Sequence, residues 1–341
     1  MNVLVTGAAG YIGSVVTEEL IKNGNFVIAV DNLERGHRTA IHPDAMFVLA
    51  DILDADGLDQ IFGKYHVDAV MHLAAKVEVN ESMSNPEKYF LTNTVGGMNL
   101  LRIMLKHNVK KIIFSSTAAV YGNPAHVPVT EESLTIPANS YGETKLAFER
   151  ILHWYSLAYG IDFITFRYFN AAGASANYGC DHKNETLLIP IVLQVALGQR
   201  EYVPIFGVDY PTMDGTCIRD FIHVSDIANA HMLALEHLGC KSSKRFYNLG
   251  NGIGYSVLEI IKVAMQVTGA DIRSKGQARR AGDQPIVIAS SDLAKSELGW
   301  EPRYKDCSSI IESAWSWQKK HPYGYDQSQN EGGLQIFNTL K

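Results

Sequence analysis

Near the start of the chain stands the stretch Val3-Leu4-Val5-Thr6-Gly7-Ala8-Ala9-Gly10-Tyr11-Ile12-Gly13. It joins an apolar run that favours a strand to a glycine-rich turn and then to a helical pattern. Gly7 suits a tight turn, Gly10 lets the backbone approach a ligand closely, and Gly13 lets the helix pack on the strand. The free N–H groups and the positive dipole end of such a helix attract a pyrophosphate. The spacing is G-x-x-G-x-x-G, which alone is weak evidence because such turns also occur as purely structural features.

The segments that follow alternate short β-rich runs with longer helical patterns, as in a parallel sheet covered by helices on both faces. The predicted strands are Asn2–Thr6, Phe26–Val30, Met46–Ala50, Ala69–Leu73, Lys111–Ser115 and Asp162–Tyr168. The predicted helices of this half are Tyr11–Lys22, Pro86–His107 and Tyr141–Tyr159. The expected fold class is therefore α/β, a doubly wound parallel sheet of the Rossmann type, and we assign residues 1–170 to it.

Residues 171–341 are expected to form a smaller mixed α/β domain, with a segment near 217–238 returning to the first domain. The pattern loosens over 170–185, which is rich in Ala, Gly and Asn. The helices predicted beyond it are Thr186–Gly198, Val224–Leu238, Val257–Thr268 and Ser308–Lys319. We expect this domain to cover the carboxyl edge of the first sheet, where doubly wound folds bind ligands, and the tail near 327–333 to lack fixed structure.

The composition is that of a globular protein, with 341 residues, 46% hydrophobic and 19% charged residues, and a net charge of -6. The net negative charge without a basic cluster argues against a nucleic-acid surface. The four cysteines, Cys180, Cys217, Cys240 and Cys307, form no C-x-x-C pair and suit a reducing compartment. No apolar run reaches membrane-spanning length, so a soluble cytoplasmic protein is expected. The twelve histidines show no metal-binding spacing, and no metal site is predicted.

Asp31 ends the second predicted strand, about 20 residues after the glycine turn. A carboxylate at this point accepts hydrogen bonds from an adenosine ribose and repels a 2′-phosphate. The sequence therefore favours NAD over NADP, although Arg35 nearby weakens the inference. The alternative is a surface aspartate that opens the Asp31-Asn32 turn.

Tyr141 and Lys145 stand four residues apart on a predicted helix, so both can face one site. A phenol needs its pKa lowered by about 3 units, or about 4 kcal/mol, to act as a base near pH 7. One positive charge at about 6 Å supplies only about 2–3 kcal/mol at an effective dielectric constant of about 20. We infer that Tyr141 becomes a competent base only when the second positive charge, on an oxidised nicotinamide, is also present. Tyr-x-x-x-Lys alone is common, and its place after the glycine turn and Asp31 is what makes it informative.

The run Ser115-Ser116-Thr117 brings hydroxyl groups to the carboxyl end of the fifth predicted strand. Thr117 is predicted to hydrogen-bond the reacting hydroxyl and relay its proton to Tyr141. Serine and threonine also satisfy backbone groups at strand ends. We expect both uses, for different members of the run.

With these motifs in place, the chain resembles the UDP-glucose 4-epimerase family of extended short-chain dehydrogenases, from the first strand to His321-Pro322. The further motifs that carry the resemblance are Asp31-Asn32-Leu33, Asp51-Ile52, His72-Leu73-Ala74-Ala75, Asn93, Arg167-Tyr168-Phe169-Asn170, Ile205-Phe206-Gly207, Asp209-Tyr210-Pro211-Thr212, Asp214-Gly215-Thr216, Arg219-Asp220-Phe221-Ile222-His223-Val224 and Arg279-Arg280-Ala281-Gly282-Asp283. The stretch 209–224 is far more specific than the glycine turn.

The resemblance implies a role for each matching position. The implied NAD contacts are Gly7, Gly10, Tyr11, Ile12, Gly13, Asp31, Asn32, Asp51, Ile52, Leu73, Ala74, Asn93, Ser115, Tyr141, Lys145 and Tyr168. The implied nucleotide-sugar contacts are Thr117, Tyr141, Asn170, Phe206, Arg219, Arg280, Asp283 and Val287. The planar guanidinium groups of the two arginines suit a diphosphate, whereas the structural alternative for Arg219 is a surface ion pair with Asp220 or Asp226.

Three positions depart from the family pattern. Thr117 stands where many relatives have Ser, so the hydroxyl is kept. Val77 stands where some relatives have a cofactor-binding Lys, and Lys76 is the neighbouring residue. Leu187 replaces an Asn or His that can touch the diphosphate, so that contact is in doubt.

The activity implied by the resemblance is the interconversion of UDP-glucose and UDP-galactose through a 4-keto sugar, with tightly bound NAD, in a homodimer. UDP-N-acetylhexosamines are possible further substrates, because Val287 lacks the ring of the Tyr found in hexose-restricted relatives. The alternatives are another NAD-dependent nucleotide-sugar epimerase, a 4,6-dehydratase and a non-catalytic NAD-binding protein. Ala118-Ala119 replace the Asp-Glu pair that a dehydratase needs after the Thr, and the intact Tyr141, Lys145 and Thr117 argue against a non-catalytic role.

Overall fold

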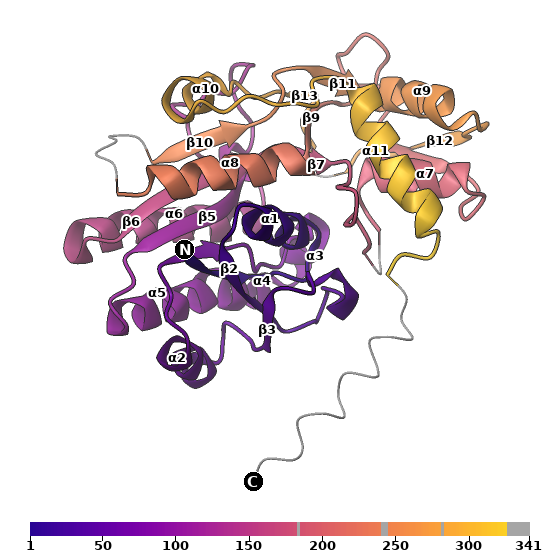
Figure 1. Cartoon of the computed structure of the whole chain (residues 1–341). Coiled ribbons are helices and arrows are strands. Elements are labelled where there is room, and N and C mark those ends of the chain that lie inside the picture. The colour runs from indigo at the N-terminus through magenta and orange to yellow at the C-terminus, as the bar shows by residue number, and fades with distance from the viewer. Residues whose placement is uncertain (183–184, 240–244, 281–282, 326–341) are drawn as a thin grey trace.

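A computed structural model describes residues 1–182, 185–239, 245–280 and 283–325 of the chain (Figure 1). Its centre is a seven-stranded sheet in the order β10-β6-β5-β4-β1-β2-β3, and every neighbouring pair is parallel. The strands are β1 (Asn2–Thr6), β2 (Phe26–Asp31), β3 (Met46–Leu49), β4 (Ala69–His72), β5 (Lys111–Thr117), β6 (Asp162–Tyr168) and β10 (Phe246–Leu249). The predicted doubly wound α/β class is confirmed.

Helices cover both faces of this sheet (Figure 1), so its strands are buried on both sides except at the β3 edge. On one face lie α1 (Tyr11–Lys22) and α8 (Val224–His237), which pack together, with α10 (Asp292–Leu298) beside α8. On the other lie α2 (Ala55–Lys64), α5 (Gly97–Lys106) and α6 (Ser140–Tyr159). Strand β1 alternates between them: Val3 and Val5 belong to the α1 core and Leu4 to the opposite core. This alternation explains why the strand is apolar throughout.

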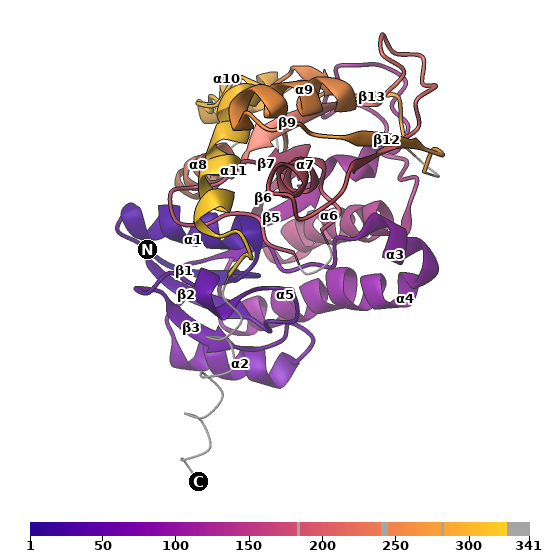
Figure 2. The same ribbon diagram turned by 90° about the vertical axis from the view of Figure 1, so that its right-hand side faces the viewer.

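Strands and helices from the part of the chain after residue 169 form a smaller mixed layer beyond the carboxyl ends of the large sheet (Figure 2). Strands β11 (Gly254–Ser256), β9 (Ile218–His223) and β13 (Ile286–Val287) form a sheet, with β7 (Asn170–Ala172) also paired to β9. A second pair joins β8 (Val203–Phe206) to β12 (Ser274–Gln277). Helices α7 (Leu188–Ala196), α9 (Val257–Thr268) and α11 (Cys307–Lys320) complete this layer around a core of their own.

Most predicted elements of the first half are present, and α1, β1 and β6 have the predicted bounds. The expected single helix over 86–107 is wrong. The segment comprises α4 (Pro86–Tyr89), a π-helical stretch (Phe90–Gly96) and α5. At the junction a Cβ on Gly97 would lie 2.4 Å from the Phe148 ring, so the glycine lets the segment pack closely there.

Several short elements were not predicted. They include α2, α3 (Val79–Ser84), α10 and β10. Strand β10 comes from the second half of the chain but pairs with β6, while α8, inside the segment expected to return, packs on α1. The domain division at residue 170 stays a prediction, and the tail near 327–333 lies outside the described residues. None of the described helices combines the length and the apolar character needed to cross a membrane.

Candidate functional site

A cleft of about 960 Å³ opens at the carboxyl edge of the large sheet, beneath the smaller layer. From β1 the chain adds β2 and β3 on one side of the sheet, and then crosses back to add β4 on the other side of β1. Doubly wound sheets bind ligands at such a switch point. The cleft is lined both by the ends of these strands and by residues of β8, β9 and β13.

The cleft brings together nearly all of the predicted site residues. Its lining includes Gly7, Gly10, Tyr11, Ile12, Gly13, Asp31, Asn32, Asp51, Ile52, Leu73, Ala74, Ser115, Thr117, Tyr141, Lys145, Tyr168, Asn170, Phe206, Arg219, Arg280, Asp283 and Val287. Asn93 is absent from this lining and is buried. Its side chain accepts from Lys76 N and donates to Lys76 O and Thr144 Oγ1. The structure thus gives Asn93 a positioning role under the cleft floor, and its contact with NAD stays a prediction.

The glycine turn at the start of α1 has the geometry of a backbone cradle. Gly7 has a φ of 73°, and a Cβ there would lie 2.6 Å from Ala74 N. A Cβ on Gly13 would lie 2.0 Å from Gly7 O, so the helix packs directly on the turn. Helix α1 begins after Gly10 without a side-chain cap or an acidic residue in its first turn. Its first N–H groups and dipole are therefore available to a pyrophosphate.

Asp31 braces this turn from the end of β2. Its Oδ2 accepts a hydrogen bond from Ala9 N at 2.9 Å, and its Oδ1 accepts one from Leu33 N at 2.8 Å. The alternative of a surface aspartate is wrong, because Asp31 is buried and lines the cleft. Its contact with a ribose stays a prediction. Burial raises the pKa of Asp31, while the two backbone N–H groups act in the opposite direction.

Tyr141, Thr117 and Lys145 converge on the cleft from two elements. Thr117 ends β5, and its side chain caps the following turn by accepting from Ala119 N at 3.1 Å. The Tyr141 phenol, in the first turn of α6, lies near enough to the same side chain for the Thr117 hydroxyl to favour its ionised form. One turn later, Lys145 Nζ donates to Ser115 O at 2.8 Å and lies 4.8 Å from the centre of the Phe114 ring. The hydroxyl pair and the ammonium group therefore share one end of β5.

Loss of hydration disfavours the charged forms of both titratable groups. Burial raises the pKa of Tyr141 to about 12, with the nearby Thr117 hydroxyl acting against it. Burial also lowers the pKa of Lys145 to about 7, with the Glu149 carboxylate acting against it. A phenolate and an ammonium in this pocket would each stabilise the other's charge. Without a further positive charge Tyr141 is a phenol at neutral pH, in agreement with the electrostatic argument from the sequence.

A buried ion pair behind the cleft was not predicted. Arg167 Nε and Nη2 donate to the two carboxylate oxygens of Glu149 at 3.1 and 2.6 Å. Ser116 Oγ donates to the same carboxylate at 2.5 Å, so Ser116 is the structural member of the hydroxyl run. Arg167 also donates to the Tyr121 hydroxyl at 2.9 Å. This network ties α6 to β5 and β6 and holds Lys145 in place. The only sequence signal was Arg167 within a mostly apolar strand, since Glu149 is one of several charged residues in its helix.

The predicted diphosphate contacts gather at β9 and β13. Arg219 Nη1 donates to Ile218 O and Gln284 O at 2.9 and 2.7 Å, and its Nη2 lies 3.7 Å from Asp283 Oδ1. Arg280 Nε donates to Asp283 Oδ2 at 2.9 Å, and its guanidinium stacks 4.7 Å from the centre of the Phe206 ring. Two guanidinium groups thus flank one carboxylate beside an aromatic face.

The structural alternative for Arg219 is wrong, because Asp220 and Asp226 do not form surface ion pairs. Asp220 accepts from the backbone N–H groups of Asn251, Gly252 and Ala289. Asp226 accepts from those of Arg303 and Tyr304. Both carboxylates are buried and position loops.

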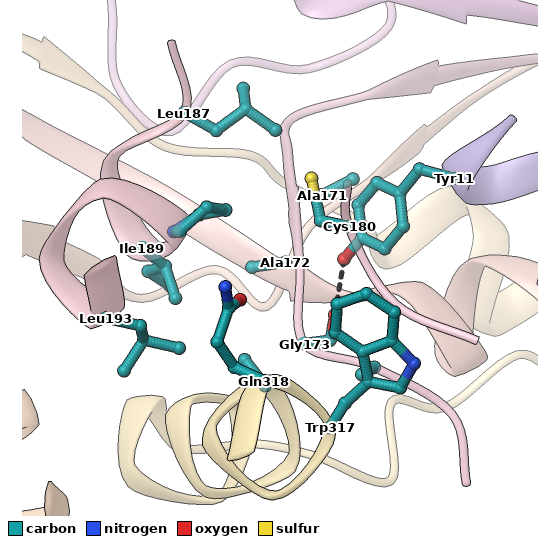
Figure 3. Close-up of a pocket in the computed structure, with 13 residues that line it drawn as sticks. Tyr11, Ala171, Ala172, Gly173, Cys180, Leu187, Ile189, Leu193, Trp317 and Gln318 are labelled. Carbon is teal, nitrogen blue, oxygen red and sulfur yellow. Dashed lines mark hydrogen bonds between the residues drawn. The ribbon is translucent and has the colours of Figure 1, made fainter. Parts of the chain in front are cut away.

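The departures from the family pattern also lie at the cleft. Val77 and Lys76 both line it, and Lys76 Nζ pairs with Glu34. Leu187 lines the cleft and also a small apolar pocket beneath it, shown in Figure 3. In that pocket the Tyr11 hydroxyl donates to Gly173 O at 2.6 Å, which ties the glycine turn to β7 and the segment after it (Figure 3).

Residues 3–250 match the family described as the NAD dependent epimerase/dehydratase family. This chain belongs to that family. It is 52% identical to a UDP-glucose 4-epimerase of Halalkalibacterium halodurans over 97% of this chain and 99% of the relative. A crystal structure of a UDP-glucose 4-epimerase is 49% identical and superposes with a TM-score of 0.93, over 96% of this chain and 100% of the other. The Bifidobacterium longum UDP-glucose 4-epimerase, solved with NAD+ and UDP, is 38% identical with a TM-score of 0.91, over 95% and 100% of the chains.

Membership of the NAD dependent epimerase/dehydratase family agrees with the predicted cofactor. The glycine cradle, the carboxylate of Asp31 and the Tyr141 phenol fit NAD, since they offer N–H groups, a ribose acceptor and a proton-transferring group in one cleft. The chain spans 99% to 100% of the length of the relatives compared above.

Proposed function

We propose that this chain interconverts UDP-glucose and UDP-galactose by inverting C4 of the sugar. The observation that carries the proposal is the meeting of Thr117, Tyr141 and Lys145 in one cleft with the glycine cradle on one side and the two arginines on the other. The close relatives named as UDP-glucose 4-epimerases support it. A UDP-sugar and NAD are the proposed ligands of the cleft.

The residues at the end of β5 would move the proton of the reaction. Thr117 hydrogen-bonds the sugar's 4-hydroxyl and passes its proton to Tyr141, which the ammonium of Lys145 stabilises as a phenolate. The glycine cradle and Asp31 would hold NAD, which would supply reversible hydride transfer at C4 of the sugar. Tyr141 gives the proton back to the new 4-hydroxyl. No net oxidation occurs, so the cofactor need not leave.

Arg219, Arg280 and Phe206 would hold the nucleotide end while the 4-keto sugar turns over. The guanidinium groups suit the diphosphate, and Asp283 suits a ribose hydroxyl. Holding the diphosphate while the sugar rotates requires contacts concentrated at the nucleotide end, as this arrangement provides.

A 4,6-dehydratase reaction is disfavoured by the turn that follows Thr117. Ala118 and Ala119 line the cleft where elimination of water needs an acid and a base. Methyl groups cannot transfer protons, so the cleft lacks these groups at that position.

The test is a two-step assay without added NAD. Purified protein is incubated with UDP-galactose, the reaction is stopped, the protein is removed, and UDP-glucose is then measured by chromatography. Conversion by the wild type and its loss in Tyr141→Phe would support the proposal. A 4-keto-6-deoxy product would identify a dehydratase, and bound NAD without conversion would identify a non-catalytic NAD-binding protein.

Two further proposals accompany this one. The free thiols of Cys180, Cys217 and Cys307 suit a cytoplasmic location. A homodimer is proposed from the family resemblance, and sedimentation at micromolar concentration tests it.

A further inference from the structure

Three different metal-binding side chains meet between β7 and α7. Cys180 Sγ lies 3.5 Å from His182 Nδ1 and 3.5 Å from Glu185 Oε2. The same two atoms of His182 and Glu185 lie 3.6 Å apart. A sulfur, a nitrogen and an oxygen therefore form a nearly equilateral triangle. Within the described residues, no other group of three His, Cys, Asp or Glu side chains brings its ligand atoms together in this way.

The size of the triangle is that of one face of a tetrahedral zinc site. With a Zn–S bond of about 2.3 Å and Zn–N and Zn–O bonds of about 2.0 Å, tetrahedral angles separate sulfur from the other ligand atoms by about 3.5 Å and nitrogen from oxygen by about 3.3 Å. The two separations from Cys180 Sγ are 3.5 Å, and the 3.6 Å between His182 Nδ1 and Glu185 Oε2 would shorten by about 0.3 Å on binding. One cysteine, one histidine and one carboxylate are also a ligand set that Zn²⁺ accepts, with a fourth position left open to water.

The carboxylate of Glu185 is oriented for this purpose by its neighbours. Its Oε1 accepts hydrogen bonds from the backbone N–H groups of Thr186 and Leu187 at 2.8 and 2.7 Å. These bonds leave Oε2 directed at Cys180 and His182. Hydrogen bonds to the second oxygen of a ligating carboxylate are a common device for fixing its direction.

The backbone on the other side of the cluster is also anchored. Asp181 Oδ2 lies 3.3 Å from His37 Nε2 and accepts from Tyr325 N at 2.7 Å. Asp181 is therefore paired elsewhere, and the two residues beside it, Cys180 and His182, are held at fixed positions. His182 lines the large cleft, which gives an ion a path from solvent.

We propose that Cys180, His182 and Glu185 bind one Zn²⁺ ion at the edge of the cleft. The ion would fasten the segment before α7 beside the glycine turn, because Cys180 lines the same small pocket as Tyr11 (Figure 3). Binding breaks the S–H bond of Cys180 and forms a Zn–S bond, and the proton passes to solvent. The metal takes no part in the proposed epimerisation, so this proposal stands independently of that activity.

Metal binding by the purified full-length protein tests the proposal without any substrate. Protein stripped with a chelator is titrated with Zn²⁺ against a chromophoric competitor and, separately, with Co²⁺, which accepts the same ligands. We expect one ion per chain, a thiolate-to-cobalt charge-transfer band, and a thermal unfolding midpoint that rises with Zn²⁺ concentration.

Cys180→Ser and His182→Gln should each weaken Zn²⁺ binding at least about 100-fold, because loss of a direct ligand exceeds the usual effect of losing a supporting hydrogen bond. Cys180→Ser should also abolish the cobalt band. The matched controls are Cys217→Ser, a buried thiol elsewhere in the cleft lining, and His66→Gln, an exposed histidine paired with Asp68. Both should bind Zn²⁺ as the wild type does.

Glu185→Gln is the third ligand variant. Glu185 also accepts hydrogen bonds from two backbone N–H groups, so a thermal unfolding curve in the presence of chelator must first show that this variant is folded. The other two ligand variants carry the test if it does not. Failure of the wild type to bind one equivalent at micromolar Zn²⁺ would overturn the proposal and leave a hydrogen-bonded triad. Equal binding by wild type and Cys180→Ser would overturn it as well.

Discussion

The Thr117 side chain lies beside the Tyr141 phenol, although one residue ends β5 and the other lies in the first turn of α6. This contact lowers the pKa of Tyr141 while burial raises it, and the balance lies at about 12. The phenol is therefore protonated at neutral pH in the protein alone. Proton transfer in the proposed reaction depends on charges that favour the phenolate.

Tyr141→Phe should retain NAD and the fold but lose about 10²–10⁴-fold or more in turnover, because the proposed proton acceptor is gone. Turnover is measured by the two-step UDP-galactose assay, and cofactor content by the absorbance of the released nucleotide. Thr117→Ser is the matched control that keeps a hydroxyl and should stay near wild-type activity. Turnover of Tyr141→Phe within tenfold of wild type would contradict the assignment.

Lys145→Met should lower activity and also move its pH profile to higher pH. Removal of the Lys145 side chain takes away a positive charge one turn from Tyr141 on α6, so we expect the pKa of Tyr141 to rise further. The measurement is kcat/KM of both proteins across pH 6 to 10. An unchanged profile would show that Lys145 acts by positioning alone, through its bond to Ser115 O.

Unfolding the purified protein should release NAD or NADH rather than NADP, because the carboxylate of Asp31 at the end of β2 repels a 2′-phosphate. The released nucleotide is identified by chromatography. Asp31→Ala should both relax this preference and loosen the turn, since it removes the acceptor for Ala9 N and Leu33 N. A predominance of NADP in the wild type would refute the reading of this strand end.

Val287→Tyr should narrow the range of substrates. Val287 pairs with Arg219 across β13 and β9 and lines the cleft, so a ring there would occupy space beside the sugar. Overpacking costs about 1–3 kcal/mol, or about 5- to 150-fold in binding. We expect wild type to epimerise UDP-N-acetylglucosamine measurably and the variant to lose that activity selectively. Discrimination above a thousandfold in wild type, or an unchanged ratio in the variant, would exclude Val287 as the gate.

The free energy of unfolding should fall as pH drops from about 6.5 towards 4, the window between the histidine pKa values in the unfolded and folded states. Burial lowers the pKa of His72 to about 3 and those of His223 and His231 to about 4, so the unfolded chain binds more protons in this window. Asp220, whose pKa burial raises to about 6, contributes the opposite slope.

Near pH 5 these four groups together should make the unfolded chain bind about two more protons than the folded protein. The free energy of unfolding should therefore change by about 3 kcal/mol per pH unit. Urea unfolding at pH 7, 6 and 5 measures it. His231→Gln should reduce this slope by about one proton, while the exposed His66→Gln should leave it unchanged. Stability that does not depend on pH over this range would show that these histidines are not buried in their neutral form.

The sequence alone determined the local parts of this protein. An apolar run, three glycines and a helical pattern define β1, the turn and α1, and the four-residue spacing of Tyr141 and Lys145 places both on one side of α6. These features depend on neighbours in the chain, so periodicity and glycine positions reveal them. The resemblance to the family added Arg219 and Arg280, which lie far along the chain, to the predicted site.

Only the tertiary structure decided which distant residues meet. Strand β10 is too short to be recognised locally, yet it completes the sheet by pairing with β6. Asn93 proved to be a buried support, and the Glu149–Arg167 ion pair joins a helix to a strand. The triangle of Cys180, His182 and Glu185 has no familiar metal-binding spacing. Its atoms meet in a segment without regular secondary structure, where side-chain directions carry no periodic signal in the sequence.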